Sequence, residues 1–217
     1  YQCAWMKCYH PVEFMSALLH SALKTGSKKS ADKDKLRIYL AECKRMGIRV
    51  LAPDVNKAGV TVTPDAANRT IYYGLADVGN VGVDEAEAII RERENGVFTG
   101  DDLDQTMLRV RACGVRSRAA VALASVGGFD SVRPNRGAVL AAVESAWSAS
   151  RRTVDNAAAF GGGGDLFSAF MPGEVPDPYA DVVDVSFIDR LRGEYEFMNT
   201  FVSGFPTDRV GDGFATP

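Results

Sequence analysis

Two closely spaced glycines, Gly79 and Gly82, come directly before a helical pattern and form the first arrangement that could do chemistry. Glycine can take backbone conformations closed to larger residues, and Asn80 is among the few other types that enter the left-handed region at low cost. A helix behind such a turn offers unpaired N–H groups and the positive end of its dipole to an anion. The spacing therefore predicts a turn whose backbone amides can hold a phosphate, which is the outline of a helix-hairpin-helix.

A second glycine turn follows at Gly114, and arginines cluster about it. Arg116 and Arg118 flank this turn. Four further arginines precede the turn or follow the next helix: Arg109, Arg111, Arg133 and Arg136. Backbone amides combined with arginines contact phosphates without regard to base sequence, and such contacts weaken steeply with salt. An arginine run is often only a solvated surface, but these arginines gather at one turn, which favours the phosphate contact.

The helix after the first turn begins with carboxylates. Asp84, Glu85 and Glu87 compete with phosphate for the positive end of the helix dipole. The first turn is therefore as well explained by a structural connector as by a phosphate contact. The second turn, with its arginines, is the better DNA-binding candidate.

The elements that must position these turns are mostly helical. Hydrophobic spacing predicts helices over 11–26, 36–47, 83–96, 118–127 and 187–201. Another helix begins at Thr99 to Asp102 with Thr99 or Asp101 as its N-cap, and a long helix starts at Pro134. A short strand over 48–51 and a hairpin over 60–73 complete the pattern. The predicted fold is mainly α with a small β-hairpin.

Composition limits the possible functions. The 217 residues are 46% apolar and carry a net charge of -3, which hides strong charge blocks. Residues 1–57 hold 11 Lys and Arg against 5 Asp and Glu, and residues 106–152 hold 8 against 2. Residues 65–104 and 161–217 each hold 3 against 10. A polyanion would therefore meet the first and third blocks.

No catalytic or metal site is predicted. Cys3, Cys8, Cys43 and Cys113 lack the C-x-x-C spacing of a zinc or redox site, so buried free thiols are expected. No apolar run approaches the roughly 18 residues of a membrane span, so a membrane partner is not expected. A glycosylase built on the same motif would need a catalytic lysine or aspartate soon after the hairpin, and no lysine follows Lys57.

Several longer segments resemble the fingers region of the bacterial replicative DNA polymerase III alpha subunit. They are 1–15 and 42–56, and the likeness continues in order through the first glycine turn, through 127–130 (GGFD), to 203–206 (SGFP). The resemblance implies five parts. These are the end of the fingers (1–59), a β-hairpin connector (60–73), tandem helix-hairpin-helix motifs on duplex DNA (74–152), a flexible linker with a clamp-binding segment (153–180), and a lead-in to a following domain (181–217).

The resemblance also implies where the chemistry lies. In that family the aspartates that hold two magnesium ions belong to a palm domain upstream of this region, so this chain alone is expected to lack polymerase activity and to hold no cofactor. Because the sequence begins at Tyr1 within a helical pattern, we expect it to be a piece of a longer protein or a processed product. The expected partners are duplex DNA, the sliding clamp and the rest of the polymerase and replisome, in the cytoplasm. Lys44, Arg45 and Arg49 are further DNA-binding candidates in the fingers part.

The chain departs from the family at two motifs. The first hairpin usually reads Lys-Gly-Val-Gly, and residues 79–82 read Gly-Asn-Val-Gly, which removes one phosphate-pairing charge. The clamp motif usually begins with glutamine, whereas Asp165, Leu166 and Phe167 keep only the Leu-Phe anchor. A weakened or partner-specific clamp contact and a vestigial segment both fit this change. A self-standing helix-hairpin-helix module that binds DNA or the clamp without belonging to a polymerase is the alternative function.

Overall fold

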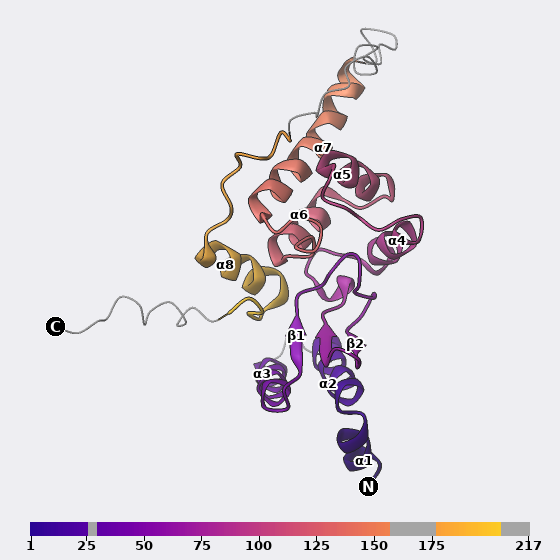
Figure 1. Ribbon diagram of the computed structural model, residues 1–217, viewed down its shortest axis with the longest axis vertical. Coiled ribbons are helices and arrows are strands. Elements are labelled where there is room, and N and C mark those ends of the chain that lie inside the picture. The colour runs from indigo at the N-terminus through magenta and orange to yellow at the C-terminus, as the bar shows by residue number, and fades with distance from the viewer. Residues whose placement is uncertain (26–29, 157–176, 205–217) are drawn as a thin grey trace, which may run out of the picture.

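The computed structural model describes residues 1–25, 30–156 and 177–204 and is mainly helical (Figure 1). The prediction of an α-rich fold with a small β-element is confirmed. The predicted clamp-binding residues Asp165, Leu166 and Phe167 lie outside the described residues. The described helices are α1 (Gln2–Tyr9), α2 (Pro11–Thr25), α3 (Ser30–Arg45), the 3-10 turn η1 (Leu75–Asp77), α4 (Val83–Glu94), α5 (Leu103–Ala112), α6 (Ser117–Val126), α7 (Arg136–Asn156) and α8 (Phe187–Met198).

The β-hairpin is part of a three-stranded sheet. Strands β2 (Thr63–Asp65) and β3 (Thr70–Tyr72) pair antiparallel, and β1 (Arg49–Leu51) joins β3 in parallel. Because the strand order is β1-β3-β2, Pro64 lies on an edge strand, where proline is tolerated. The predicted β-hairpin connector (60–73) therefore lies in one sheet with β1, which belongs to the segment predicted as the end of the fingers (1–59).

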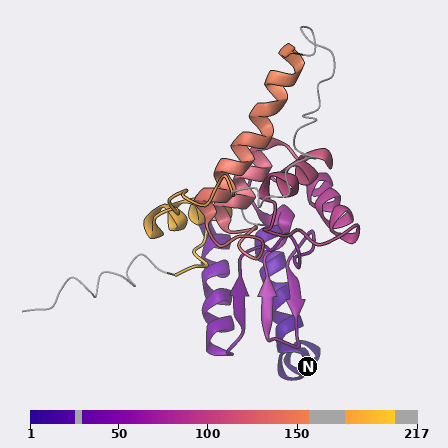
Figure 2. The same ribbon diagram turned by 45° about the horizontal axis from the view of Figure 1, so that its top comes forward.

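The N-terminal half is built by α2 and α3 against this sheet (Figure 2). Met15 and Leu19 of α2 pack with Cys43 of α3 and with Ile71 of β3 in one hydrophobic cluster. Helix α1 adds no residue to this core; it packs on α2, and Lys7 donates to Glu42 of α3 at 2.8 Å. The apolar stripe at 3.6-residue spacing in α2 and α3 therefore faces the sheet, as amphipathic helices do.

The cysteine prediction is only half right. Cys43 is fully buried and Cys113 is half-buried, but Cys3 and Cys8 are exposed. Both exposed thiols belong to α1, and this helix buries none of its residues. The expectation of buried thiols was therefore wrong for these two positions.

The remaining helices, α4 to α8, form a larger helical core, which we call the helical half. Alanines such as Ala119 and Ala138 are fully buried where α6 packs on α7, and their small side chains let the two helices approach closely. Asp102 is the N-cap of α5, because its side chain accepts a 2.8 Å hydrogen bond from the Gln105 N–H. Of the predicted caps, Thr99 was wrong by three residues and Asp101, in the Asp101-Asp102 pair, by one.

Helix α7 also begins later than predicted. It starts at Arg136 rather than at Pro134, since the side chain of Asn135 accepts a 3.0 Å hydrogen bond from the Ala138 N–H. Asparagine is a strong N-cap residue, and it fixes the start of this helix.

Among the described helices, none is long and apolar enough to cross a membrane.

Candidate nucleic-acid interface

The first hairpin connects η1 to α4, and both of its glycine amides have acceptors within the chain. The Gly79 N–H donates to the Phe197 carbonyl at 2.7 Å, and the Gly82 N–H donates to Glu85 Oε2 at 2.9 Å. Asn80 has φ +70°, so the prediction that it enters the left-handed region is confirmed. These hydrogen bonds support the connector alternative for this hairpin, because a phosphate would have to displace them.

The glycines of the first hairpin are explained by close approach rather than by unusual φ angles. Neither Gly79 nor Gly82 has a positive φ. A Cβ atom added to Gly79 would lie 3.2 Å from the Phe197 carbonyl oxygen, so α8 packs directly on this turn. By contrast, Gly114 in the second hairpin has φ +89° with no atom within 4 Å of an added Cβ, so there the backbone angle requires glycine.

The second hairpin connects α5 to α6 and leaves donors free. None of the hydrogen bonds among the described residues uses the N–H groups of Ser117 or Arg118, which lie in the first turn of α6. The Arg118 side chain is exposed, and it forms no ion pair within the described part of the chain. An anion at this turn could therefore meet two backbone N–H groups and one guanidinium.

Glu85 of α4 joins the two hairpin turns. Its carboxylate accepts hydrogen bonds from the Arg116 N–H, Nε and Nη2, each at 2.9 Å, in addition to the Gly82 N–H. The Glu85 side chain is 9% exposed and the Arg116 side chain 73% exposed. The hydrogen bonds from Arg116 are the main reason that the pKa of Glu85 falls from 4.5 to about 2. The predicted contact Arg116 is therefore paired with an acid of the first hairpin.

The arginines before the second turn are used inside the fold. Arg109 donates from Nε to Glu92 Oε1 at 3.0 Å and from Nη2 to the Gly96 carbonyl at 2.7 Å. Arg111 donates from Nη1 to the Ala146 carbonyl at 2.7 Å. Arg109 thus satisfies groups at the end of α4, where helix carbonyls lack partners. Both side chains tie α5 to its neighbours, and their contact with a phosphate stays a prediction.

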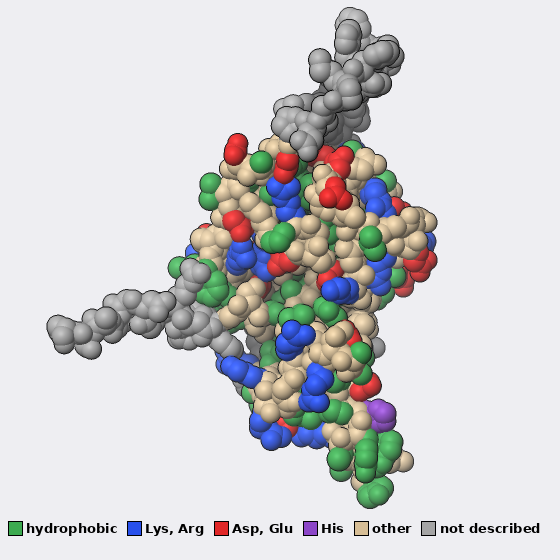
Figure 3. Space-filling model, in the orientation of Figure 1, with side chains coloured by type: hydrophobic (Ala, Val, Ile, Leu, Met, Phe, Trp, Pro, Cys, Tyr) green, Lys and Arg blue, Asp and Glu red, His purple; other side chains and the backbone are tan. Residues whose placement is uncertain are grey.

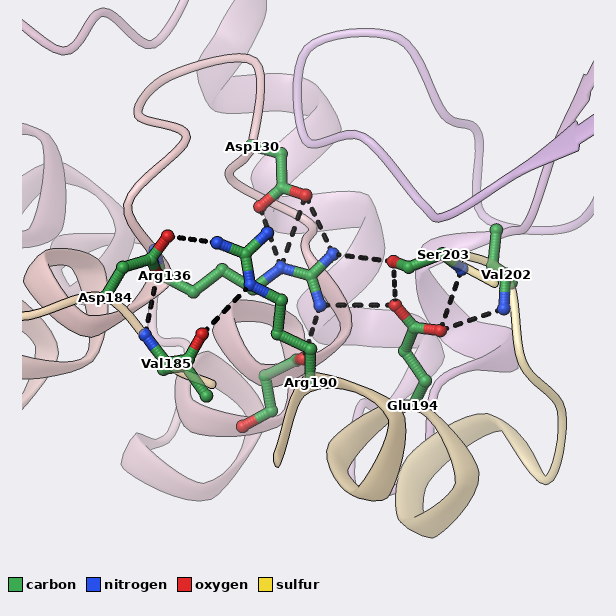
Figure 4. Close-up of polar contacts among 9 residues, drawn as sticks. Asp130, Arg136, Asp184, Val185, Arg190, Glu194, Val202 and Ser203 are labelled. Carbon is green, nitrogen blue, oxygen red and sulfur yellow. Dashed lines mark hydrogen bonds and ion pairs between the residues drawn. The ribbon is translucent and has the colours of Figure 1, made fainter. Parts of the chain in front are cut away.

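The arginines after α6 lie in a different place from the turn. Arg133 pairs with Asp177 at 2.5 Å, and Arg136 is only 3% exposed. The Arg136 guanidinium lies between two carboxylates, at 2.8 Å from Asp130 and 3.2 Å from Glu194 (Figure 4). Arg136 cannot be part of a surface contact, so that expectation was wrong. Its partner Glu194 is 58 residues away in the sequence, and no local pattern could have indicated the pair.

Glu194 completes this buried network. It is fully buried and accepts hydrogen bonds from the backbone N–H groups of Val202 at 2.8 Å and Ser203 at 3.0 Å, and from the Ser203 hydroxyl. Figure 4 shows Arg136 reaching from α7 to Asp130 on one side and to Ser203 and Glu194 on the other. Asp130 belongs to the GGFD segment and Ser203 to the SGFP segment. The two distant motifs of the resemblance therefore meet at one arginine.

The basic residues of the N-terminal half form a second cationic surface, visible as blue side chains in the lower part of Figure 3. Lys44 at the end of α3 is exposed and has no charged partner among the described residues. Arg45 is paired with Glu42 at 2.7 Å, and Arg49 donates to the Thr70 hydroxyl at 3.3 Å. Lys44 is thus the freest of the three predicted contacts.

The described residues contain no group of three or more His, Cys, Asp or Glu side chains that could hold a metal ion. The two hairpins and the N-terminal basic surface offer backbone N–H groups and positive charge, which suit them to binding an anion.

Comparison with known proteins gives a consistent result. A family model described as helix-hairpin-helix motif matches residues 47–139, which include both hairpins. The DNA polymerase III subunit alpha of Thermus aquaticus is 34% identical over 214 residues, and those of Vibrio cholerae and Pseudomonas aeruginosa are 32% and 31% identical. Each alignment covers 96% of this chain but only 16 to 18% of the relative, so the chain spans about a sixth of their length. Over the segment that it spans, the chain belongs to the DNA polymerase III alpha subunit family.

Proposed function

We propose that this chain binds the phosphate backbone of duplex DNA through its second hairpin, as part of a replicative DNA polymerase. The observation that carries the proposal is the free first turn of α6, with the exposed Arg118 beside it, within the region that matches the helix-hairpin-helix model. Backbone amides and one guanidinium recognise phosphate oxygens and read no bases. The contact would hold DNA in place without selecting its sequence.

The chemical step of a polymerase would lie elsewhere in this proposal. The magnesium ions that catalyse nucleotidyl transfer would be bound by a palm domain outside this segment. The segment's own work would be to hold DNA, in the cytoplasm, where a bacterial replicative polymerase acts. Primer extension distinguishes part of a polymerase from the alternative, a self-standing module. A longer protein that contains this segment should extend a primer, whereas a self-standing module should bind DNA without extending it.

Fluorescence anisotropy with duplex DNA at a series of salt concentrations tests the DNA contact. Arg118→Ala should weaken the affinity about tenfold, because it removes a charge-assisted contact. The slope of log affinity against log salt should become shallower by about 0.9, the value for one lost phosphate contact. Arg91→Ala is the matched control, since Arg91 is exposed at the far end of α4 and has no ion pair among the described residues. Equal curves for the two variants would contradict the proposal.

We also propose a contact with the sliding clamp through Asp165, Leu166 and Phe167. The support is the Leu-Phe anchor in the sequence, a pair that fits a hydrophobic pocket on a partner. The variant Leu166→Ala/Phe167→Ala should lose binding to the clamp of the same organism in calorimetry while binding duplex DNA like the parent. Equal heat of binding for the parent and the double variant would remove this part of the proposal.

A further inference from the structure

The carboxylate of Glu85 is bound by the kind of donors that hold a phosphate. Its two oxygens accept from one backbone N–H of each hairpin, those of Gly82 and Arg116, and from two nitrogens of the Arg116 guanidinium. All four contacts are 2.9 Å long. Proteins usually bind a phosphate in the same way, through N–H groups at a helix N-terminus and an arginine side chain.

From this geometry we infer that Glu85 is an internal competitor for the DNA phosphate and decides whether Arg116 of the second hairpin contacts the duplex. The inference rests on the proposed function. With Glu85 in place, the Arg116 guanidinium of the second hairpin is paired and the Gly82 amide of the first hairpin is satisfied. Arg118 forms no ion pair among the described residues, so in the native chain the contact at the second hairpin falls to Arg118 and the N–H groups beside it.

The burial of the two partners supports this role. The Glu85 side chain is 9% exposed and therefore loses little by desolvation when DNA approaches, whereas the Arg116 side chain is 73% exposed and keeps a free edge toward solvent. A surface ion pair in the usual sense would leave both partners solvated and contribute little. Here the acid is held from two hairpins, and the arginine remains within reach of a ligand. Removal of the negative charge should therefore give DNA a contact that the native chain lacks.

Glu85→Gln tests the inference in the full chain, with duplex DNA as the probe. It keeps the size of the side chain and an oxygen for the Gly82 N–H while it releases the Arg116 charge. The affinity should rise about tenfold, and the salt slope should steepen by about 0.9. Glu87→Gln is the matched control, because it removes an equal charge from an exposed position two residues along the same helix. It should leave the slope unchanged.

A double-mutant cycle with Arg116→Ala assigns the gain to the arginine. In the parent chain this substitution should leave the slope unchanged, because Glu85 already holds the guanidinium. In the Glu85→Gln background it should abolish the gain. A weaker affinity for Glu85→Gln, or the same change as for Glu87→Gln, overturns the inference and makes Glu85 a residue that only positions Arg116.

Two further results keep the test decisive. If Glu85→Gln loses its helical circular dichroism, the parent-chain effect of Arg116→Ala still decides, since a slope that falls by about 0.9 would show that Arg116 already contacts phosphate. If the parent chain does not bind duplex DNA at all, the proposed function fails first. The inference fails alone only when the parent binds and the charge of Glu85 makes no difference.

Discussion

At the scale of single residues, three glycines serve two different purposes. Gly79 and Gly82 leave room for a carbonyl of α8 and for the carboxylate of Glu85, while Gly114 supplies a positive φ. The sequence indicated glycine turns correctly, but it could not distinguish these reasons. The carbonyl near Gly79 belongs to Phe197, more than a hundred residues away, and such packing leaves no local pattern in the sequence.

The four cysteines should react at very different rates. Cys43 is fully buried, and desolvation raises its pKa from 9.0 to about 11, so it forms little thiolate near pH 8. Cys3 and Cys8 are exposed. Titration of the native chain with a coloured disulfide reagent should show two fast thiols, and Cys43 should react only after unfolding in denaturant. A fast phase that includes Cys43, identified by mass spectrometry, would contradict the buried position.

Glu85 should make stability depend on pH in acid. Its pKa is about 2 in the folded chain against 4.5 for the ordinary group, so the unfolded chain binds the proton more readily. The stabilisation is fully present above pH 4.5 and is lost as the pH falls toward 2. Urea unfolding between pH 6 and pH 3 should therefore show a smaller loss of stability for Glu85→Gln than for the parent chain. Glu87→Gln should lose as much as the parent.

At the scale of elements, one buried arginine joins three parts of the chain. Arg136 begins α7, its partner Asp130 belongs to the loop after α6, and its partner Glu194 belongs to α8. Gly127 and its φ of +87° end α6 and leave space for this guanidinium, since an added Cβ would lie 2.3 Å from Arg136 Nη2. The glycine that ends α6 and the arginine that begins α7 are thus consistent with the packing of α8.

Breaking this pair should be costly, and replacing both partners should be less so. Glu194→Gln leaves Arg136 with only Asp130 as a charged partner, and loss of one partner of a buried ion pair typically costs about 3 to 5 kcal/mol. The double variant Arg136→Met/Glu194→Gln removes both charges, keeps an oxygen for the N–H groups of Val202 and Ser203, and should be closer to the parent in stability. Chemical denaturation followed by circular dichroism measures both. A single variant as stable as the parent would show that the pair is not desolvated in solution.

The elements themselves were largely predictable, and the reasons are visible in particular residues. Helical spacing of Val12, Met15 and Leu19 identified α2. The turn residues 64–68 identified the hairpin of β2 and β3, although Pro64 and Asp65 lie in β2 and not in the turn. Strand β1 was predicted at 48–51, but its parallel pairing with β3 and the pairs of Arg109, Arg111 and Arg136 were not predictable, because each joins residues far apart in the sequence. The site was predicted as a cluster of arginines, and the fold separates that cluster into structural arginines and the exposed Arg116 and Arg118.

At the scale of the whole molecule, positive charge is presented in two separate halves. The N-terminal half carries Lys44 near the end of α3, and the helical half carries Arg118 at the start of α6 (Figure 1). The net charge of -3 conceals both surfaces, since acidic blocks lie between and after them. A molecule of this kind attracts a polyanion locally and not as a whole.

Duplex length should distinguish one continuous DNA path from two independent sites. If one duplex lies along both halves, Lys44→Ala should weaken binding only for duplexes long enough to reach α3, whereas Arg118→Ala should weaken binding at every length. On long duplexes the two losses in binding free energy should add, because the residues lie in different halves. Anisotropy on a series of duplex lengths measures this, with Arg91→Ala as the control. No effect of Lys44→Ala at any length would restrict the DNA path to the helical half.

The contacts of residues 177–204 with the helical half also have a consequence for a cut chain. The Arg133 to Asp177 ion pair, the hydrogen bond from the Tyr179 hydroxyl to Asp104, and the buried Glu194 network all hold this stretch without help from the peptide bonds before it. A protease that cleaved the backbone between Asn156 and Asp177 would therefore yield two polypeptides that migrate together in a native gel. They would part only in denaturant, as complementary pieces of one folded body.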